Sequence, residues 1–242
     1  MEDKISISDL WSGLGLRLAS NGFQCGLLAL LAFLPIGGLA LISPDQLGTG
    51  GTSEFLLAAI LLSRFLTPPV AALVVAYLAR KEGLLPADQS LWLSFRRCGL
   101  PSAGLVLGVA VFTLLSSLLL VVPGVTFALA TCVVLPVMVV ENMTGPQAVR
   151  RSWELTRDHR WSLFGFWLGL AALASAFLAV IFLLVSEPVG SLVEPLPLVQ
   201  KDIFLPMVLA SAFLYAVGVI ASFQIYTRLA VGASASGDSE RA

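Results

Sequence analysis

The sequence predicts an all-α integral membrane protein that crosses the bilayer six times, and three observations lead to this fold class. Of the 242 residues, 57% are hydrophobic and only 12% are charged, with a mean hydropathy of +0.92. A soluble domain carries about 25% charged residues. Six apolar runs are long enough to cross a hydrocarbon core of about 30 Å. Finally, the basic residues are concentrated in alternate connecting segments, as in membrane proteins of defined orientation.

The six predicted spans cover residues 23–42, 55–79, 103–122, 124–140, 161–185 and 203–226. The first run is too long for the core of a signal peptide, so we interpret it as a retained span. The third and fourth runs are separated by little more than Pro123 and Gly124. Because proline and glycine end a helix and turn the chain, we expect a tight hairpin there rather than a single bent span.

The positive charges determine the expected orientation. Twelve of the 14 Lys and Arg residues lie in the N-terminal segment, in the loops after spans two and four, or in the C-terminal tail. The opposite loops contain only Lys201, and Arg64 lies within span two. Short loops rich in Lys and Arg stay in the cytoplasm. We therefore expect an inner-membrane protein with both termini cytoplasmic, and the net charge of −1 gives no indication of a nucleic-acid partner.

Three segments on the expected cytoplasmic side are predicted to form short amphipathic helices. They carry Trp11, Trp92 and Trp153, each near basic residues. Short amphipathic helices with tryptophan and basic side chains suit the plane of the lipid headgroups. Two roles remain open for them: they brace the helix bundle, or they bind anionic lipid headgroups. Membrane lipids are therefore the expected partners.

The third amphipathic helix has the clearest division between faces. Its apolar face is expected to carry Ala148, Ser152 and Trp153. The basic residues of its polar face are Arg150, Arg151 and Arg157.

The three tryptophans also lie at matched distances before three GxxxG motifs. Trp11 precedes the motif that opens at Gly22 by eleven residues, and the other two tryptophans precede theirs, at Gly104 and Gly165, by twelve. Small residues one turn apart let helices approach closely in lipid. The spacing predicts a three-fold parallel repeat, with units 6–79, 88–141 and 145–227 in one membrane domain, 1–227. Residues 228–242 are expected to form a disordered cytoplasmic tail.

A family resemblance is sharpest over about 40 residues, from the start of the fourth span into the third amphipathic helix. A Pro-Gly pair opens a span, a proline lies near its end, and a Glu and an Ala-x-x-x-Ser-Trp helix follow. These positions hold Pro123, Gly124, Pro136, Glu141, Ala148, Ser152 and Trp153. The pattern resembles the membrane-domain family of glycerophosphoryl diester phosphodiesterases. The resemblance implies the architecture of that membrane domain and not hydrolysis, because we expect no catalytic domain here.

No pattern in the chain predicts an enzyme, a metal site or a cofactor. The single histidine, His159, is not accompanied by an HExxH, GxSxG or P-loop motif. The three cysteines are scattered and are interpreted as packing residues. Two intramembrane polar residues are candidates for a structural or functional role. Arg64 lies near the middle of span two, where burial in lipid is costly, so it is expected to face protein or water, and Glu141 lies at the inner end of span four.

Two classes of function are consistent with these patterns. The first is a noncatalytic membrane module that organises lipids or partner proteins, which the interfacial tryptophans favour. The second is a small solute transporter or channel, with Arg64 in the pathway and a helix broken at Pro68 and Pro69, because broken helices at mid-membrane often mark solute sites. The single deep ionisable group favours the module.

Overall fold

The computed structural model describes residues 6–41, 44–85, 101–105, 108–109, 111, 121–143, 145–185 and 201–239. All regular structure in these ranges is helical, which confirms the predicted all-α class. The elements are α1 (Ile7–Leu41), α2 (Pro44–Lys81), α4 (Val121–Thr131), α5 (Val134–Val140), α6 (Pro146–Thr156), the 3-10 turn η1 (Arg157–His159), α7 (Arg160–Val185) and α8 (Lys201–Ser239). Residues 101–105 are also helical.

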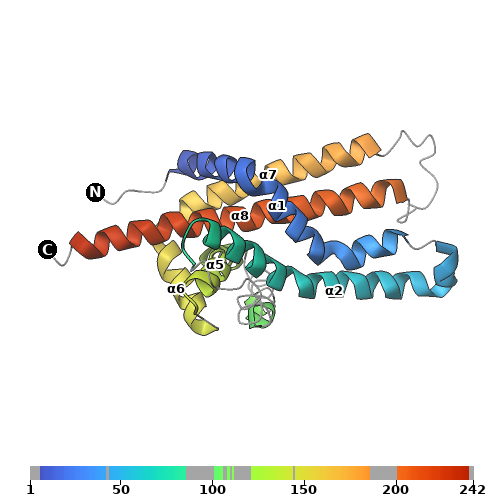
Figure 1. Cartoon of the computed structure of the whole chain (residues 1–242), viewed down its shortest axis with the longest axis horizontal. Helices are drawn as coiled ribbons and strands as arrows, with labels where there is room; N and C mark the ends of the chain where they lie inside the picture. Colours follow the sequence, from blue (N-terminus) through green and yellow to red (C-terminus); the bar gives the residue numbers. More distant parts are fainter. Residues whose placement is uncertain are drawn as a thin grey trace.

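Four helices are long and apolar enough to cross a membrane. The stretches are Ile7–Pro35, Leu61–Lys81, Pro146–Ile181 and Leu205–Ala230. The helices α1, α2, α7 and α8 run along the long axis of the molecule, and α1 begins at the same end of the bundle at which α8 ends (Figure 1). The short helix α6 lies across that end. The molecule is thus built as an integral membrane protein. Most of the third predicted span lies outside the described residues, so six spans remain a prediction.

The fourth predicted span is not one helix. The stretch Gly124–Val140 is apolar but short, and it is divided into α4 and α5 by a turn at Cys132 and Val133. Pro136 explains the division, because it has no N–H to bond the carbonyl of Cys132 four residues earlier, and its ring crowds that carbonyl. Pro123 and Gly124 lie in the first turns of α4, where proline is tolerated, and the expected hairpin with the preceding span falls outside the described residues.

The double proline of the second span does not break its helix. α2 continues from Pro44 to Lys81 through Pro68 and Pro69. Pro68 leaves the carbonyl of Arg64 without its helical donor, and the Thr67 hydroxyl donates to that oxygen at 2.8 Å. The freed carbonyl is therefore satisfied locally, and the expected break at the two prolines is wrong.

Two expected boundaries also differ in the structure. The N-terminal amphipathic segment and the first span form one continuous helix, α1, rather than two elements. At the other end of the chain, α8 extends to Ser239, into the segment that was expected to form the tail.

The core lies where α1, α2, α5 and α8 meet near the end crossed by α6. Its large, fully buried side chains include Leu10 of α1, Leu78 of α2, Met138 of α5 and Phe223 of α8. α7 contributes Phe166 to the same cluster, whereas farther along α7 most side chains are exposed, as lipid-facing helices are.

Candidate functional site at the polar end of the bundle

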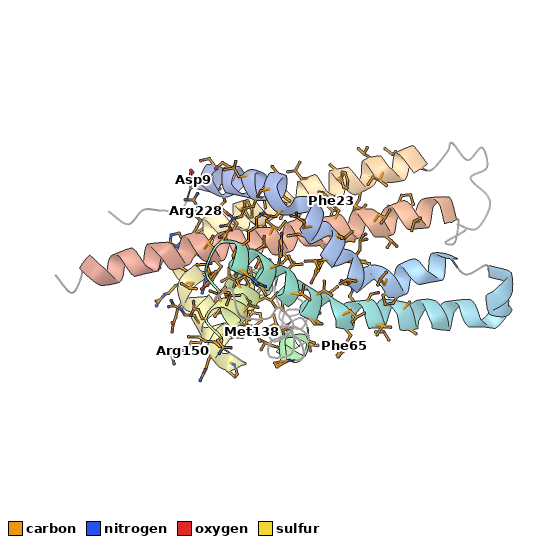
Figure 2. All side chains as sticks on the ribbon, viewed as in Figure 1. Asp9, Phe23, Phe65, Met138, Arg150 and Arg228 are labelled. Carbon is orange, nitrogen blue, oxygen red and sulfur yellow. The ribbon has the colours of Figure 1, made fainter. Side chains whose placement is uncertain are left out.

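Ionisable side chains gather at the end of the bundle where α1 begins and α8 ends, which we call the polar end. Figure 2 shows Asp9, Arg150 and Arg228 there, away from Phe65. In sequence, Arg17 and Arg160 are the last ionisable residues before the apolar stretches of α1 and α7. The polar end therefore marks one level along the helices at which charge gives way to apolar surface.

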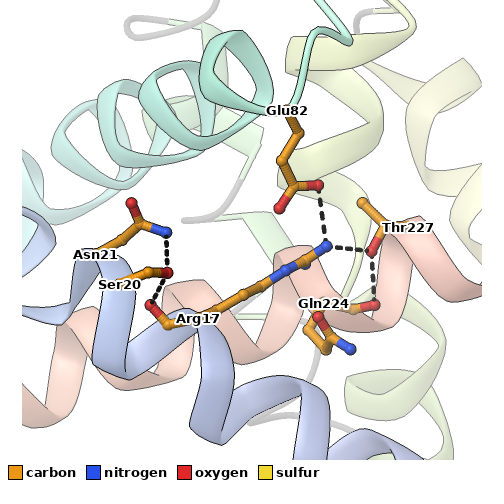
Figure 3. Close-up of polar contacts among 6 residues, drawn as sticks. All are labelled: Arg17, Ser20, Asn21, Glu82, Gln224 and Thr227. Carbon is orange, nitrogen blue, oxygen red and sulfur yellow. Dashed lines mark hydrogen bonds and ion pairs between the residues drawn. The ribbon is translucent and has the colours of Figure 1, made fainter.

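Arg17 is the centre of a hydrogen-bond network that joins three elements (Figure 3). Its Nη2 donates to Glu82 Oε2 at 2.9 Å and to Thr227 Oγ1 at 3.0 Å. Its guanidinium lies over the Phe223 ring, 5.0 Å from the centroid, a favourable cation–π arrangement. The Thr227 hydroxyl in turn donates to the carbonyl of Gln224 at 3.0 Å. The network ties α1 to the end of α2 and to α8.

This role of Arg17 was not predicted, because the sequence pattern indicated only that Arg17 belongs to the basic N-terminal segment. A signal was present, because Leu10, Leu14 and Arg17 lie four and then three residues apart and share one helix face. Both leucines are buried, and the Arg17 side chain is only 18% exposed. An arginine on the buried face of an amphipathic helix indicates a partner inside the protein.

Two opposing effects act on Glu82, which follows the last residue of α2. Partial burial raises the pKa of its carboxyl group, and the attraction of Arg17 opposes that rise. Burial is the larger effect, so the pKa of Glu82 lies above its ordinary value. The ion pair therefore links Arg17 to Glu82, but the attraction of Arg17 does not fully offset the cost of burying the charged carboxylate.

A second set of contacts joins α1 to α2 beside Arg17. Lys81 Nζ donates to Asn21 Oδ1 at 2.5 Å, and Asn21 is buried. One turn further, the Tyr77 hydroxyl donates to Gln24 Oε1 at 3.3 Å. Polar side chains on these two helices thus pair with one another rather than facing lipid unpaired.

Glu141 links the end of α5 to α6 and α8. Arg151 Nε donates to its Oε2 at 3.2 Å, and the Tyr226 hydroxyl donates to its Oε1 at 3.2 Å. The carboxylate of Glu141 and the guanidinium of Arg151 are 19% and 35% exposed. This geometry is that of a helix-linking residue, one of the two roles considered for Glu141.

Ser152 satisfies a backbone group that the α4–α5 turn leaves open. Its hydroxyl donates to the Ala130 carbonyl at 2.6 Å within the protein interior. The Ser222 hydroxyl of α8 donates to the carbonyl of Cys132, which Pro136 leaves without its helical donor. Three positions of the recognised pattern, Pro136, Glu141 and Ser152, therefore act together to hold α4, α5, α6 and α8.

α6 presents a different face from the expected one. Ala148 and Ser152 are buried as predicted, but Trp153 is 38% exposed, at the edge of the buried face, and its ring lies 6.4 Å from that of Phe127 in α4. Arg151 turns toward Glu141 instead of joining the polar face. Arg150 does face outward and pairs with Glu154 at 3.1 Å.

Arg157 is also exposed, and the guanidinium of Arg160 lies 4.4 Å from the centre of the Trp153 ring. The outer face of α6 and η1 is therefore a mixture of arginine and tryptophan.

Arg64 does not face the bundle interior. Its side chain is exposed and makes no ion pair or hydrogen bond with any residue that the structure describes. The described residues thus supply no polar partner for Arg64, and it stands apart from the polar end.

The three GxxxG motifs do not share one packing role. A Cβ at Gly169 would lie 2.9 Å from Trp11 Cζ2, and one at Gly165 would lie 3.1 Å from Ile7 Cδ1. The two glycines of α7 thus leave room for the side chains of Ile7 and Trp11 of α1 to pack against that helix. Gly22 meets only a side chain of its own helix, and nothing described approaches Gly104 within 4 Å. The three-fold repeat is not confirmed.

An apolar cavity of about 340 Å³ lies between α2, α5, α7 and α8. Its lining consists of Val75, Leu135, Trp167, Leu214, Tyr215, Gly218, Val219 and Ser222. The hydroxyls of Tyr215 and Ser222 donate to backbone carbonyls, of Thr67 and Cys132, so they are engaged within the protein. Within the described part of the chain, no cluster of His, Cys, Asp and Glu could hold a metal ion.

Comparison with known proteins identifies the family of this architecture. No curated protein and no solved structure matches the chain. The model of the family described as the membrane domain of glycerophosphoryl diester phosphodiesterase matches residues 107–238, a range that contains Pro136, Glu141, Ser152 and the polar ends of α7 and α8. The chain therefore belongs to the family of glycerophosphoryl diester phosphodiesterase membrane domains.

Proposed function

We propose that this chain is a noncatalytic membrane module that organises lipids at the cytoplasmic surface of the inner membrane. The observation that carries the proposal is α6, which lies across the polar end (Figure 1) and presents arginine and tryptophan outward. Glu141 and Ser152 hold the helix in that position. A short amphipathic helix with this composition suits the headgroup region of a bilayer.

The proposed orientation places the polar end in the cytoplasm. Twelve of 14 basic residues then lie inside, in agreement with the positive-inside rule. Because α1 begins at the same end of the bundle at which α8 ends, the chain must cross the membrane an even number of times. Six crossings satisfy that requirement and use all six apolar runs of the sequence.

The alternative, a transporter or channel with Arg64 in its pathway, has less support. Arg64 is exposed, and α2 passes through Pro68 and Pro69 without a break. In the stretch that is divided at Cys132 and Val133, the carbonyls of Ala130 and Cys132 accept hydrogen bonds from serine hydroxyls. Unwound backbone that binds ions needs free carbonyls, and these two are occupied.

Reconstitution tests the proposal against the alternative. The purified chain is placed in liposomes that contain phosphatidylcholine and phosphatidylglycerol, and flux of protons, potassium, chloride and phosphate is measured beside lipid retention. We expect retained anionic lipid and no flux above protein-free liposomes. A flux that Arg64→Leu abolishes would establish the transporter instead.

A further inference from the structure

The geometry points to a binding site for the phosphate group of an anionic phospholipid at the junction of α6, η1 and α7. We call it the Arg157–Arg160 site, and its members are Trp153, Arg157, Arg160 and Trp161. The inference rests on the proposed function, because it names the lipid chemistry and the residues through which the module would act.

The arginines of this region divide into two that are paired and two that are not. Arg150 pairs with Glu154, and Arg151 pairs with Glu141. The side chain of Arg157 is exposed and has no ion-pair or hydrogen-bond partner among the described residues.

Arg160 has a buried Nε that likewise finds no acceptor in the described part of the chain. Arg157 and Arg160 lie three residues apart, and neither positive charge is paired with an acid that the structure describes.

Trp153 holds one of these cations in position. The central carbon of the Arg160 guanidinium lies over its ring, 4.4 Å from the centroid, a favourable cation–π arrangement. A guanidinium edge binds two oxygens of a phosphate at once. Because the stacking orders the side chain in advance, less conformational entropy is lost when a phosphate binds.

The site lies at the depth where lipid phosphates are found. Arg160 is the last ionisable residue before the uncharged stretch that continues to the end of α7. Trp161 follows it and is 86% exposed, and Phe164 and Leu168 continue an exposed apolar face along α7. Tryptophan is enriched at the membrane–water boundary. A lipid with its phosphate on the arginines would lay its acyl chains along Phe164 and Leu168.

The charge of the neighbouring residues favours an anionic headgroup over a zwitterionic one. Asp158 is exposed and is hydrogen-bonded to neither arginine. With Arg150 and Glu154 neutralising each other, Arg157 and Arg160 outnumber the remaining acid. Phosphatidylglycerol supplies a phosphate with no compensating ammonium group, whereas phosphatidylcholine carries one.

Native mass spectrometry of the full chain in detergent tests the site by titration with phosphatidylglycerol and with phosphatidylcholine. We expect wild type to bind phosphatidylglycerol more tightly. Arg157→Gln and Arg160→Gln should each weaken that binding about tenfold, the loss of a charge-assisted hydrogen bond. Arg160→Lys keeps the charge but loses the fork and the stacking, so it should also weaken binding. The control Arg228→Gln removes one exposed charge from the polar end and should change binding less than about twofold.

Three results would overturn the site. Equal binding of the two lipids by wild type is one, and an equal loss in Arg228→Gln and Arg160→Gln, which would indicate diffuse attraction only, is another. Displacement of phosphatidylglycerol by inorganic phosphate at equal concentration would assign a soluble anion instead. Variants are compared after thermal unfolding in lipid-free detergent shows that they fold. Solute flux would refute the proposed function, whereas equal binding of the two lipids by wild type, without flux, would refute only this site.

Discussion

At the residue scale, Pro136 explains why two serines from other helices are needed where they lie. A proline inside an apolar helix leaves a carbonyl open one turn earlier, and in hydrocarbon no water can satisfy it. Ser222 bonds that carbonyl, on Cys132, and Ser152 bonds the nearby Ala130 carbonyl. The proline of the family pattern thus leaves a carbonyl of the α4–α5 turn without its helical donor, and the serine of the pattern bonds a neighbouring carbonyl of the same turn.

Ser152→Ala should destabilise the bundle by about 1–3 kcal/mol, the cost of leaving a buried carbonyl without a donor. The measurement is thermal unfolding of the purified chain in detergent. Ser8→Ala, at an exposed serine of α1, is the matched control and should unfold as wild type does. A Ser152→Ala protein as stable as the control would mean that the carbonyl is satisfied in another way.

Gly169→Ala should lower the unfolding temperature even though alanine favours helix by about 1 kcal/mol over glycine. The reason is steric, since the new Cβ would lie 2.9 Å from the Trp11 ring. Gly15→Ala is the control, because no atom lies within 4 Å of a Cβ there, and it should be neutral or stabilising. Adding Trp11→Leu should relieve the effect of Gly169→Ala. If both glycine variants gain stability, the Trp11 ring does not pack against Gly169 of α7.

At the element scale, hydropathy predicted the long helices well and their ends poorly. The apolar runs of α1, α2, α7 and α8 follow directly from composition, because lipid imposes length and apolarity on any crossing helix. The ends depend on neighbours. The N-terminal segment continues into α1 and packs Trp11 on Gly169, a contact between distant segments that no local pattern contains.

The sequence pattern also predicted the faces of α6 only in part. Periodicity correctly predicted that Ala148 and Ser152 are buried. It placed Trp153 inward as an apolar residue and Arg151 outward as a charged one, whereas both side chains are partly exposed and each also contacts the protein. Arg151 has a carboxylate to reach in Glu141, and Trp153 has a guanidinium to cover in Arg160. The partner of an amphipathic side chain, rather than its hydropathy, decides which way it turns.

The junction of α1 with α2 should show a pH dependence that belongs to Glu82. Arg17→Leu removes the attraction that opposes the burial effect, so the folded-state pKa of Glu82, already raised, should rise further. A raised folded pKa gives stability that is fully present below the unfolded value, about 4.3 for glutamate, and lost as pH rises through the folded value. The unfolding temperature of Arg17→Leu should therefore fall over that window.

The double variant Arg17→Leu with Glu82→Gln has no titrating carboxyl at this junction and should lose the added pH dependence. Glu154→Gln in the Arg17→Leu background is the control, because Glu154 is exposed and pairs only with Arg150. Thermal unfolding between about pH 4 and 8 gives the comparison, over the range set by the glutamate value above. Identical profiles for Arg17→Leu and the double variant would show that Glu82 does not titrate with folding.

At the scale of the whole molecule, the polar end combines the structural ties with the proposed lipid contacts. Arg17 joins α1 to α8 through Thr227, and Glu141 joins α5 to α6 and α8. The bonds of Glu141, together with that of Ser152, position α6 against α4, α5 and α8 from within the protein. An ordered α6 is what a defined headgroup site requires.

The orientation of the whole molecule can be tested directly. With the native cysteines replaced, single cysteines are introduced at Ser8 and Ser236, near the start of α1 and the end of α8, and at Gly48 and Ser191, in the segments expected outside. An impermeant thiol reagent is applied to intact cells and to opened cells. We expect Gly48→Cys and Ser191→Cys to react in both, and Ser8→Cys and Ser236→Cys only after opening, because Lys and Arg keep their loops in the cytoplasm. Labelling of Ser8→Cys in intact cells would invert the topology, and a difference between Ser8→Cys and Ser236→Cys would require an odd number of spans.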